Sequence, residues 1–480
     1  MTDSKKMKVL IFILAYNAEK TIVSVLDRIP RELAERYDVG VLVIDDCSKD
    51  ATWQVAQEHL CGFWCAGEAL RNPVNQGYGG NQKVGYLYAA EHRYDVVAMV
   101  HGDGQYAPER LPDLLEPFTR TDQPVDAVFG SRMLKKADAL KGGMPYYKFL
   151  GNVVLTTFQN WLLGSHLSEF HTGYRVYRVS TLSALPLHLN TNDFHFDTEI
   201  IVQVLFSGGK IVELPIPTFY GNEVCHVNGL RYAWDVVLAT VKARLIRMGI
   251  FYDPKFYFPQ TEIARTVSKF SFPSSTRVVA DAVRAGSTVL DLGYSDPELA
   301  EYLQREKHCT VIRCGGDVDL DAALPEVPWA RLEYVLALDV LEQRDEPEEF
   351  LKRLSERLAD NATACIIVGS ANVGFFVTRL MLLLGQFNYS RRGILALTHK
   401  RLFTVGSLTR LLRYAGYSAQ KQHVIAAPYP LALGMSCFSR GLVALNGALA
   451  KVLPGLFAYQ VVLEVKHAPS VESVLRNAER

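Results

Sequence analysis

At 480 residues the chain is too long for a single hydrophobic core, so two or three domains are expected. Its 51 Lys and Arg balance its 51 Asp and Glu, which gives no reason to expect a nucleic acid partner. No apolar run is long enough to predict a membrane-spanning helix. The eight cysteines are scattered and no signal peptide is predicted, so the expected location is the cytoplasm.

The first half of the chain alternates predicted strands with predicted helices. Buried strands are predicted at 9–14, 39–44 and 96–100, each followed by a helix. A glycine-dense turn at 75–83 leads into a further helix that continues through Ala90. This alternation predicts a doubly wound, mostly parallel sheet, whose strand-ending turns all lie at one carboxyl edge.

The turn after strand 96–100 is the first candidate site. Gly102, Asp103 and Gly104 break the strand abruptly, and Gln105 follows. A carboxylate at the carboxyl end of a strand, with an amide beside it, suits a hard cation that takes oxygen ligands. The same residues are ordinary in a surface turn, so this stretch by itself leaves both interpretations open.

The glycine-dense turn is the second candidate site. Gly77, Gly79 and Gly80 bring backbone N–H groups close together at the predicted start of a helix. Such a group of donors suits a diphosphate, and Lys83 adds a positive charge to it.

Taken in order, these segments resemble the family 2 glycosyltransferases of GT-A fold, and most closely their polyprenyl-phosphate (dolichol-phosphate mannose synthase-like) branch. Six segments carry the likeness: Ala15-Tyr16-Asn17-Ala18-Glu19, Asp45-Asp46-Cys47-Ser48-Lys49-Asp50, Asn75-Gln76-Gly77-Tyr78-Gly79, the turn from His101 to Gln105, Gly130-Ser131-Arg132, and Thr172-Gly173-Tyr174-Arg175. The resemblance implies an enzyme that moves a sugar from a nucleotide sugar to a polyprenyl phosphate with inversion. A growing glycan is the alternative acceptor.

The resemblance also implies roles for particular residues. Those expected to bind the nucleotide sugar are Ala15, Tyr16, Glu19, Asp45, Asp46, Gly77, Lys83 and Asp103. Mg²⁺ or Mn²⁺ would be held by Asp103 and Gln105, with His101 as a third candidate ligand. His101 stands where the family usually has Asp, so an anionic ligand is lost; this favours a lower metal affinity or a preference shifted away from Mg²⁺. A purely structural histidine at the strand end is the alternative.

On the acceptor side, Arg132 and Arg175 are expected to grip the acceptor phosphate. Glu169 joins Asp103 as a catalytic candidate, either as the base or as a residue that orients the acceptor or Arg175. The apolar helix predicted after Gly143 corresponds to a region that approaches the bilayer in this family. Peripheral contact with the cytoplasmic face of the membrane is therefore expected.

The second half resembles a class I S-adenosylmethionine-dependent methyltransferase. Asp291, Gly293 and Asp339 are the candidates for binding S-adenosylmethionine. Ser295 occupies the position of the second glycine of the family's turn and adds a Cβ where close approach matters. Two alternatives stay open: an active domain that methylates a sugar or lipid of the same pathway, or a non-catalytic scaffold.

The predicted fold class is α/β, with a GT-A (nucleotide-diphospho-sugar transferase) doubly wound sheet followed by a Rossmann-like, methyltransferase-type α/β domain. The predicted domain plan is a family 2 glycosyltransferase domain at 1–250, a linker at 251–269, a methyltransferase-like domain at 270–430 and an apolar C-terminal extension at 431–480.

Overall fold

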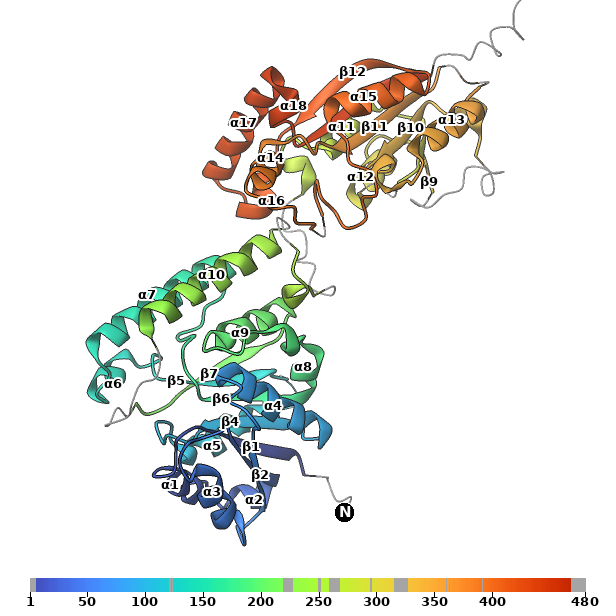
Figure 1. The fold of residues 1–480 in the computed structure, drawn as a ribbon. Helices are drawn as coiled ribbons and strands as arrows, with labels where there is room; N and C mark the ends of the chain where they lie inside the picture. The colour runs from blue at the N-terminus through green and yellow to red at the C-terminus, as the bar shows by residue number, and fades with distance from the viewer. Residues whose placement is uncertain are drawn as a thin grey trace, which may run out of the picture. The chain divides into compact units, whose positions relative to one another are not determined.

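The structure is a computed structural model, and its chain separates into two compact units (Figure 1). The first unit comprises Met1–Arg247 with Asp253–Glu262, and the second comprises Met248–Tyr252 with Ile263–Arg480. The residues described are 6–120, 122, 124–218, 228–248, 252–258, 268–293, 296–314, 327–359, 361, 363–390 and 392–467. The predicted domain boundaries at residues 250, 270 and 430 stay predictions.

The first unit is built on a seven-stranded sheet with the strand order β3-β2-β1-β4-β6-β5-β7. β1 pairs in parallel with β2 and β4, whereas β6 runs antiparallel to β4 and β5. The doubly wound, mostly parallel sheet expected for this half is confirmed. The strands are β1 (Lys8–Ala15), β2 (Asp38–Asp45), β3 (Ala66–Arg71), β4 (Val96–His101), β5 (Ala127–Ser131), β6 (Arg175–Arg178) and β7 (Ile211–Pro215).

Helices cover both faces of this sheet, because alternate residues of its central strands are apolar and point to opposite sides. Ile11 packs with Ile22 and Ala56 on one face, while Phe12 packs with Phe196 on the other. The helices are α1 (Ile22–Asp27), α2 (Leu33–Arg36), α3 (Thr52–Leu60), α4 (Tyr78–Glu91), α5 (Leu111–Leu115), α6 (Lys136–Lys141), α7 (Tyr146–Leu163), α8 (Val179–Ala184), α9 (Phe196–Phe206) and α10 (Gly229–Arg247), with short 3₁₀ turns η1 (Pro108–Arg110), η2 (Glu116–Thr119), η3 (Leu187–Leu189) and η4 (Pro254–Phe256).

The parallel register brings the strand-ending turns of this unit to one edge. Ala15 at the end of β1 is paired with Asp45 at the end of β2, and Leu14 is paired with His101 at the end of β4. Arg71 at the end of β3 is paired with Asp45. The candidate residues that follow these strands therefore share the carboxyl edge of the sheet, as the alternation of strands and helices predicts.

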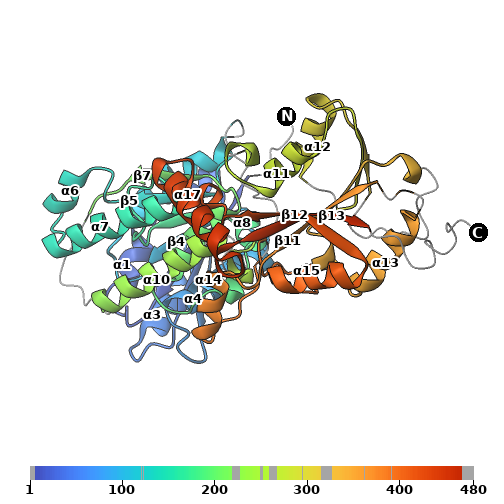
Figure 2. The same ribbon diagram turned by 90° about the horizontal axis from the view of Figure 1, so that it is seen from above.

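The second unit is built on a six-stranded sheet with the order β12-β13-β11-β10-β8-β9 (Figures 1 and 2). β8, β9, β10 and β11 run parallel, and β13 runs antiparallel to both β11 and β12. β13, which follows residue 430, is one of the strands of this sheet. The strands are β8 (Thr288–Asp291), β9 (Thr310–Arg313), β10 (Tyr334–Leu338), β11 (Cys365–Ala371), β12 (Tyr417–Ile425) and β13 (Gln460–His467).

Helices of the second unit also pack on both faces of its sheet. They are α11 (Ser275–Ala282), α12 (Pro297–Arg305), α13 (Pro347–Arg357), α14 (Phe376–Leu383), α15 (Val405–Tyr414), α16 (Tyr429–Leu433), α17 (Cys437–Val452) and α18 (Pro454–Phe457), with 3₁₀ turns η5 (Lys269–Ser271), η6 (Trp329–Arg331) and η7 (Leu341–Gln343). Among the described residues of the whole chain, no helix combines the length and the apolar character that crossing a bilayer requires.

Candidate functional site

The turns that follow β1 and β2 are hydrogen-bonded to each other. Ser48 Oγ accepts a hydrogen bond from the backbone N–H of Asn17 at 2.8 Å, and Glu19 Oε2 accepts one from the backbone N–H of Ala51 at 3.1 Å. Tyr16 lies within this pair of turns with 41% of its surface exposed. A fixed, accessible aromatic ring at the carboxyl edge is the arrangement that base stacking requires.

Asp45, the last residue of β2, is buried and faces protein donors. Its carboxylate accepts hydrogen bonds from the backbone N–H of Ser48 at 3.2 Å and from the Ser48 hydroxyl. Arg71 Nε lies 3.3 Å from Asp45 Oδ2. The carboxylate thereby fixes the turn after β2 and holds Arg71 at the same edge.

The Asp46 side chain organises the glycine-dense turn. One carboxylate oxygen accepts hydrogen bonds from Asn72 Nδ2 and from the backbone N–H of Gln76, both at 2.8 Å. The other accepts from the backbone N–H of Gly77 at 3.0 Å. Of the two adjacent acids, Asp46 therefore sets the position of the predicted diphosphate turn.

Asn192 contacts the start of α4, a contact that the sequence does not predict. Its carbonyl oxygen accepts the backbone N–H of Gly79 at 2.8 Å, and its side-chain oxygen lies 2.7 Å from Lys83 Nζ. A Cβ added to Gly77, whose φ is +78°, would lie 2.6 Å from the same carbonyl oxygen. The donors and the lysine predicted to meet a diphosphate thus contact the 190–192 segment in this structure.

We expect Gly77→Ala to lower the free energy of unfolding by about 1–3 kcal/mol, because it strains a positive φ and brings a Cβ against the Asn192 carbonyl. Urea denaturation followed by circular dichroism measures the change. The matched control is Gly62→Ala, since Gly62 has a similar φ of +87° but a Cβ added there would have no heavy atom within 4 Å. Equal losses in the two variants would show that the Asn192 contact is unimportant.

The turn after β4 presents Asp103 to solvent. The Asp103 side chain is exposed, and its Oδ1 accepts the backbone N–H of Gln105 at 3.0 Å. Gly104 has a φ of +79°, which allows the tight turn between them. The carboxylate of Asp103 and the amide oxygen of Gln105 offer the oxygen ligands that a hard divalent cation prefers.

His101, by contrast, is partly buried against protein side chains. Its Nε2 lies 3.3 Å from Tyr78 Oη, and its ring contacts Tyr106 edge-on at a centroid distance of 5.1 Å. A Cβ added to Gly173 would lie 2.6 Å from Nε2. Burial lowers the pKa of His101 below its usual 6.5, so the ring is neutral at pH 7. Tyr78 in turn donates to Asp197 Oδ2 at 3.0 Å, so His101 belongs to a partly buried polar network.

The same network contains Arg175, for which the sequence predicts a contact with an acceptor. Arg175 is fully buried, and its guanidinium lies 3.0 Å from Asp197 Oδ1. It also donates to the carbonyl oxygens of Thr172 at 2.8 Å and Phe170 at 3.0 Å. In this structure the guanidinium of Arg175 is held by protein groups, and its carboxylate partner is Asp197, while Glu169 contacts Arg132.

Glu169 holds Arg132 instead. The backbone N–H and the Nε of Arg132 donate to the two Glu169 oxygens at 2.8 and 3.1 Å, and Arg132 Nη2 makes a further contact. Asn152 Nδ2 donates to Oε1 at 2.8 Å. Burial would raise the pKa of Glu169, but the charge and hydrogen bonds of Arg132 outweigh it and hold that pKa below its usual value. An ionised carboxylate engaged in this way is a poor proton acceptor, so the geometry favours positioning over base catalysis.

A second cluster of potential metal ligands lies near the start of α10. The ligand atoms of Asp193, His195 and Asp235 all lie within 4.8 Å of one another. Arg231 is 3.9 Å from a carboxylate oxygen of each aspartate, however. The positive charge of Arg231 already offsets these acids, so the turn at Asp103 is the stronger candidate for a cation.

In the second unit, β8 is the point at which the order of strands reverses, because the chain passes to β9 on one side and β10 on the other. Ligands of open α/β sheets bind at the carboxyl ends of such strands.

Asp291 ends β8, where it is buried with Arg313 Nε 3.7 Å away. A Cβ on Gly293 would lie 2.9 Å from the Leu338 carbonyl oxygen, so the turns after β8 and β10 touch. Asp339 follows in a left-handed conformation (φ +54°). Ser295, in the predicted turn, lies outside the described residues.

Two further side chains meet at the end of β10. Gln460 Nε2 donates to Asp339 Oδ1 at 3.1 Å. Glu342 is buried, and its Oε1 accepts the backbone N–H of Ala371 at 2.9 Å. Burial, reinforced by the charge of Asp339, raises the pKa of Glu342 to about 8. Glu342 and Gln460 are not among the residues that the sequence predicts for this crevice.

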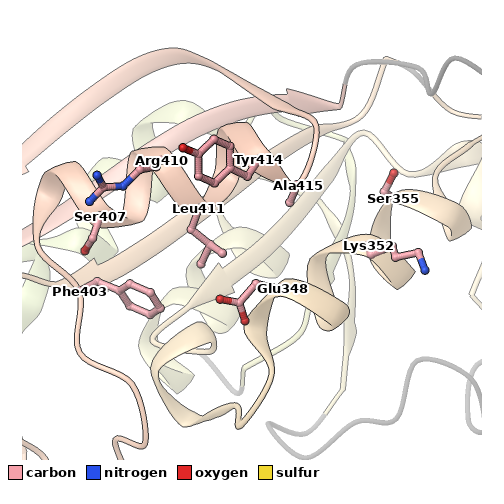
Figure 3. Close-up of a pocket in the computed structure, with 9 residues that line it drawn as sticks. All are labelled: Glu348, Lys352, Ser355, Phe403, Ser407, Arg410, Leu411, Tyr414 and Ala415. Carbon is pink, nitrogen blue, oxygen red and sulfur yellow. The ribbon is translucent and has the colours of Figure 1, made fainter.

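The second unit also has an open surface groove between α13 and α15 (Figure 3). Its volume is about 510 Å³. Its lining residues are Glu348, Lys352, Ser355, Phe403, Ser407, Arg410, Leu411, Tyr414 and Ala415. None of these is a predicted S-adenosylmethionine contact, so the groove is separate from the predicted methyltransferase-type site.

Comparison with known proteins places the first half of the chain among sugar transferases. Residues 10–185 match the model of glycosyl transferase family 2. The undecaprenyl-phosphate mannosyltransferase of Micrococcus luteus is 30% identical over 227 residues, which are 45% of this chain and 86% of that protein. The UDP-N-acetylglucosamine–dolichyl-phosphate N-acetylglucosaminyltransferase of Methanococcus voltae is 27% identical over 217 residues, which are 43% of this chain and 83% of that protein. Among solved structures, mannosyl-3-phosphoglycerate synthase of Rubrobacter xylanophilus is 21% identical, with a TM-score of 0.39 over 52% of this chain and 78% of that one.

Proposed function

The chain belongs to the family 2 glycosyltransferases, and on that premise we propose that its first unit transfers a sugar from a nucleotide sugar to a polyprenyl phosphate, with inversion. The observation that carries the proposal is the shared carboxyl edge, where Tyr16, Asp103 and Arg132 follow three different strands. The acceptor class is proposed because the two relatives above are named for undecaprenyl and dolichyl phosphates.

On the donor side, the proposed contacts come from the turns after β1 and β2, which are hydrogen-bonded to each other. Tyr16 stacks on the base, and Glu19 accepts a hydrogen bond from the nucleoside. Asp45 and Asp46 act through the turns they fix, because their carboxylates already face Ser48 and the glycine-dense turn. Gly77 and Lys83 border the diphosphate at the start of α4.

The oxygen ligands of Asp103 and Gln105 fit Mg²⁺ or Mn²⁺, and we propose these two residues as its protein ligands. A bound divalent cation neutralises negative charge on a departing diphosphate. For His101 we propose a structural role rather than that of a ligand, since its Nε2 contacts Tyr78 and its ring contacts Tyr106. With Asp103 as the only carboxylate of this set, a modest metal affinity is expected.

On the acceptor side, Arg132 is the proposed phosphate ligand, because a guanidinium grips two phosphate oxygens at once. Glu169 fixes the direction of that guanidinium. A phosphate oxygen of the acceptor forms a new bond to the sugar's anomeric carbon. The bond from that carbon to the donor diphosphate breaks, and the nucleoside diphosphate leaves with the electron pair. The attacking phosphate is already an anion, so the reaction needs no strong base.

The test is transfer of labelled sugar from UDP-, GDP- and dTDP-sugars to a short polyprenyl phosphate, with Mg²⁺, Mn²⁺ or a chelator. We expect a lipid product that requires the metal, with one donor preferred. Nucleotide binding without a lipid product would move the acceptor to the alternative class, a growing glycan. Absence of nucleotide binding would overturn the proposed function itself.

We also propose that α7 and α10 touch the membrane that holds the acceptor. The buried face of α7 carries Asn152, which contacts Glu169, while its outward Trp161 is 76% exposed. On α10, Leu230 and Trp234 are exposed as well. A helix whose large apolar side chains point outward suits the headgroup region of a bilayer. The double variant Trp161→Ser/Trp234→Ser should then lose transfer to long-chain acceptor in vesicles more than to a short, water-soluble acceptor.

For the second unit we propose an S-adenosylmethionine-binding domain of methyltransferase type, with Asp291, Gly293 and Asp339 at the crevice between β8 and β10. The proposal rests on the reversal of strand order at β8 and on the close approach at Gly293. Calorimetric titration of the full chain with S-adenosylmethionine tests it. Binding that Asp339→Ala abolishes would support the proposal, and absence of binding would favour a scaffolding role.

A further inference from the structure

The turn that carries Arg132 lies beside the outermost strand of the first sheet. β5 ends at Ser131, so Arg132 is the first residue after that strand. β7 is the outermost strand and pairs in parallel with β5 (Figure 1). Glu213 of β7 is paired with Phe129, two residues before the end of β5. Glu213 is therefore a neighbour of this turn in the sheet, although the two are far apart in the sequence.

The Glu213 carboxylate accepts three hydrogen bonds from two consecutive residues. The backbone N–H of Ser168 donates to Oε2 at 2.7 Å, and the Ser168 hydroxyl donates to Oε1 at 2.7 Å. The backbone N–H of Glu169 donates to Oε1 at 3.2 Å. An ionised carboxylate satisfies three such donors with its two oxygens, whereas an amide has only one acceptor oxygen. Glu213 thereby fixes the backbone from which the Glu169 side chain projects.

A chain of hydroxyl groups continues from Glu213 to the backbone beyond Arg132. Since the Ser168 hydroxyl donates to Glu213, its oxygen is left to accept from the Ser131 hydroxyl, 2.7 Å away. The Ser131 oxygen in turn accepts the backbone N–H groups of the two residues that follow Arg132, at 3.1 and 3.2 Å. One carboxylate thus fixes this turn twice, through the backbone of Glu169 and through the two serine hydroxyls.

Packing alone does not account for an acid at position 213. Burial, reinforced by the nearby charge of Glu169, raises the pKa of Glu213 despite the hydrogen bonds that its carboxylate accepts. A second carboxylate beside Glu169 is therefore held at a cost in free energy, which a neutral side chain would avoid. The groups that Glu213 orders include the buried Ser131 and Glu169. Their arrangement, rather than the filling of space, is what the carboxylate supplies.

We propose that Glu213 is a positioning residue for the acceptor phosphate, because it holds the turn from which Arg132 presents its guanidinium. This inference rests on the proposed function, in which Arg132 grips the phosphate. Glu213 acts through Ser168 and Glu169. A guanidinium that is already held in one direction loses less conformational freedom when it binds a ligand. The effect of Glu213 therefore falls on the affinity for the acceptor and not on the binding of the donor.

The first measurement is hydrogen exchange of the backbone at residues 132–134, followed by mass spectrometry of the full chain. In the wild type these three N–H groups donate to Glu169 or Ser131. Glu213→Gln is expected to make their exchange about tenfold faster, as the loss of about one hydrogen bond would. Ser168→Ala breaks the hydroxyl chain but leaves the Glu213 carboxylate in place, and it should speed exchange at residues 133 and 134. It also tests the proposal if Glu213→Gln fails to fold.

The second measurement is binding of farnesyl phosphate, a short polyprenyl phosphate, by calorimetry, together with steady-state sugar transfer to it. Glu213→Gln is expected to raise Kd and KM for farnesyl phosphate about tenfold. It should leave kcat and the binding of Mn²⁺ with a nucleoside diphosphate unchanged. The matched control is Glu68→Gln. Glu68 lies on β3, the outermost strand at the other side of the sheet, and its Oε2 accepts the Tyr88 hydroxyl at 2.7 Å. The control should change none of these quantities.

The outcomes separate this inference from the proposed function. Unchanged exchange at residues 132–134 in both variants would overturn the inference. So would faster exchange with an unchanged Kd for farnesyl phosphate, or a fall in kcat with an unchanged KM, which a merely structural role would produce. A wild type that binds no farnesyl phosphate would count against the proposed function, and the exchange rates would still show whether Glu213 holds the turn. Circular dichroism verifies that each variant is folded.

Discussion

Glu169→Gln is expected to lower the free energy of unfolding by about 3 kcal/mol, because it leaves the largely buried Arg132 guanidinium without its counter-charge. The variant keeps the shape of the side chain, so the loss comes from the missing charge. We also expect kcat/KM for sugar transfer to fall about 100-fold, since Arg132 is no longer held in one direction. Urea denaturation and the transfer assay measure the two effects.

Glu116→Gln is the matched control for this variant. Glu116 also pairs with an arginine, with Arg120 Nη2 3.1 Å away, but both side chains are more than half exposed. Loss of an exposed pair costs less than about 1 kcal/mol. Two results together would instead indicate that Glu169 is a catalytic base. The free energy of unfolding of Glu169→Gln would be unchanged, and its activity would no longer fall as the pH becomes acidic.

The pH dependence of stability adds a second readout. The pKa of Glu169 is lower in the folded protein than in the unfolded chain, so folding favours its ionised form. Its contribution is fully present above the unfolded pKa of about 4.3 and is lost as the pH falls through the folded value. The stability difference between the wild type and Glu169→Gln should therefore be constant from about pH 6 to 8 and shrink below about pH 4.

Asp103→Asn is expected to lower kcat by about 100- to 1,000-fold while leaving the melting temperature unchanged. Asn is as well suited to this turn as Asp, so the change removes a negative charge and little else. Binding of Mn²⁺ in the presence of a nucleoside diphosphate, followed by calorimetry, should weaken in parallel. That measurement reports on the cation without depending on turnover.

Asp38→Asn serves as the control for Asp103→Asn. Asp38 is also exposed, but it begins β2 and so lies at the opposite end of the strands from the candidate site. Its replacement should change neither kcat nor Mn²⁺ binding. Retained Mn²⁺ binding by Asp103→Asn would mean that the cation is held elsewhere, and the cluster of Asp193, His195 and Asp235 would be the next place to test.

The sequence predicts the central part of the first sheet well because local and global signals agree there. Val9 to Leu14 is an uninterrupted apolar run, as a strand buried on both faces requires, and acidic or glycine-rich turns follow each such run. The sequence does not predict β6. It has only four residues, it contains Arg175 and Arg178, and it runs antiparallel between β4 and β5. Its pairing depends on contacts distant in sequence, which no local pattern reports.

The roles of individual site residues are harder to predict, because a motif names residue types but not their partners. Arg132 and Arg175 look alike in the sequence, yet one borders the site and the other is buried against Asp197. The Asn192 contact with the start of α4 joins positions more than a hundred residues apart along the chain. Only the folded arrangement shows that His101 faces Tyr78.

The place of β13 has a consequence for the synthesis of the protein. β12 lies at the edge of the second sheet, and β13 lies between β12 and β11. As the chain leaves the ribosome, residues 365–425 emerge before the strand that joins them, so β11 has an open edge during that interval. Unpaired strand edges are prone to associate with other chains. The second unit therefore completes its sheet only when residues 460–467 have been made.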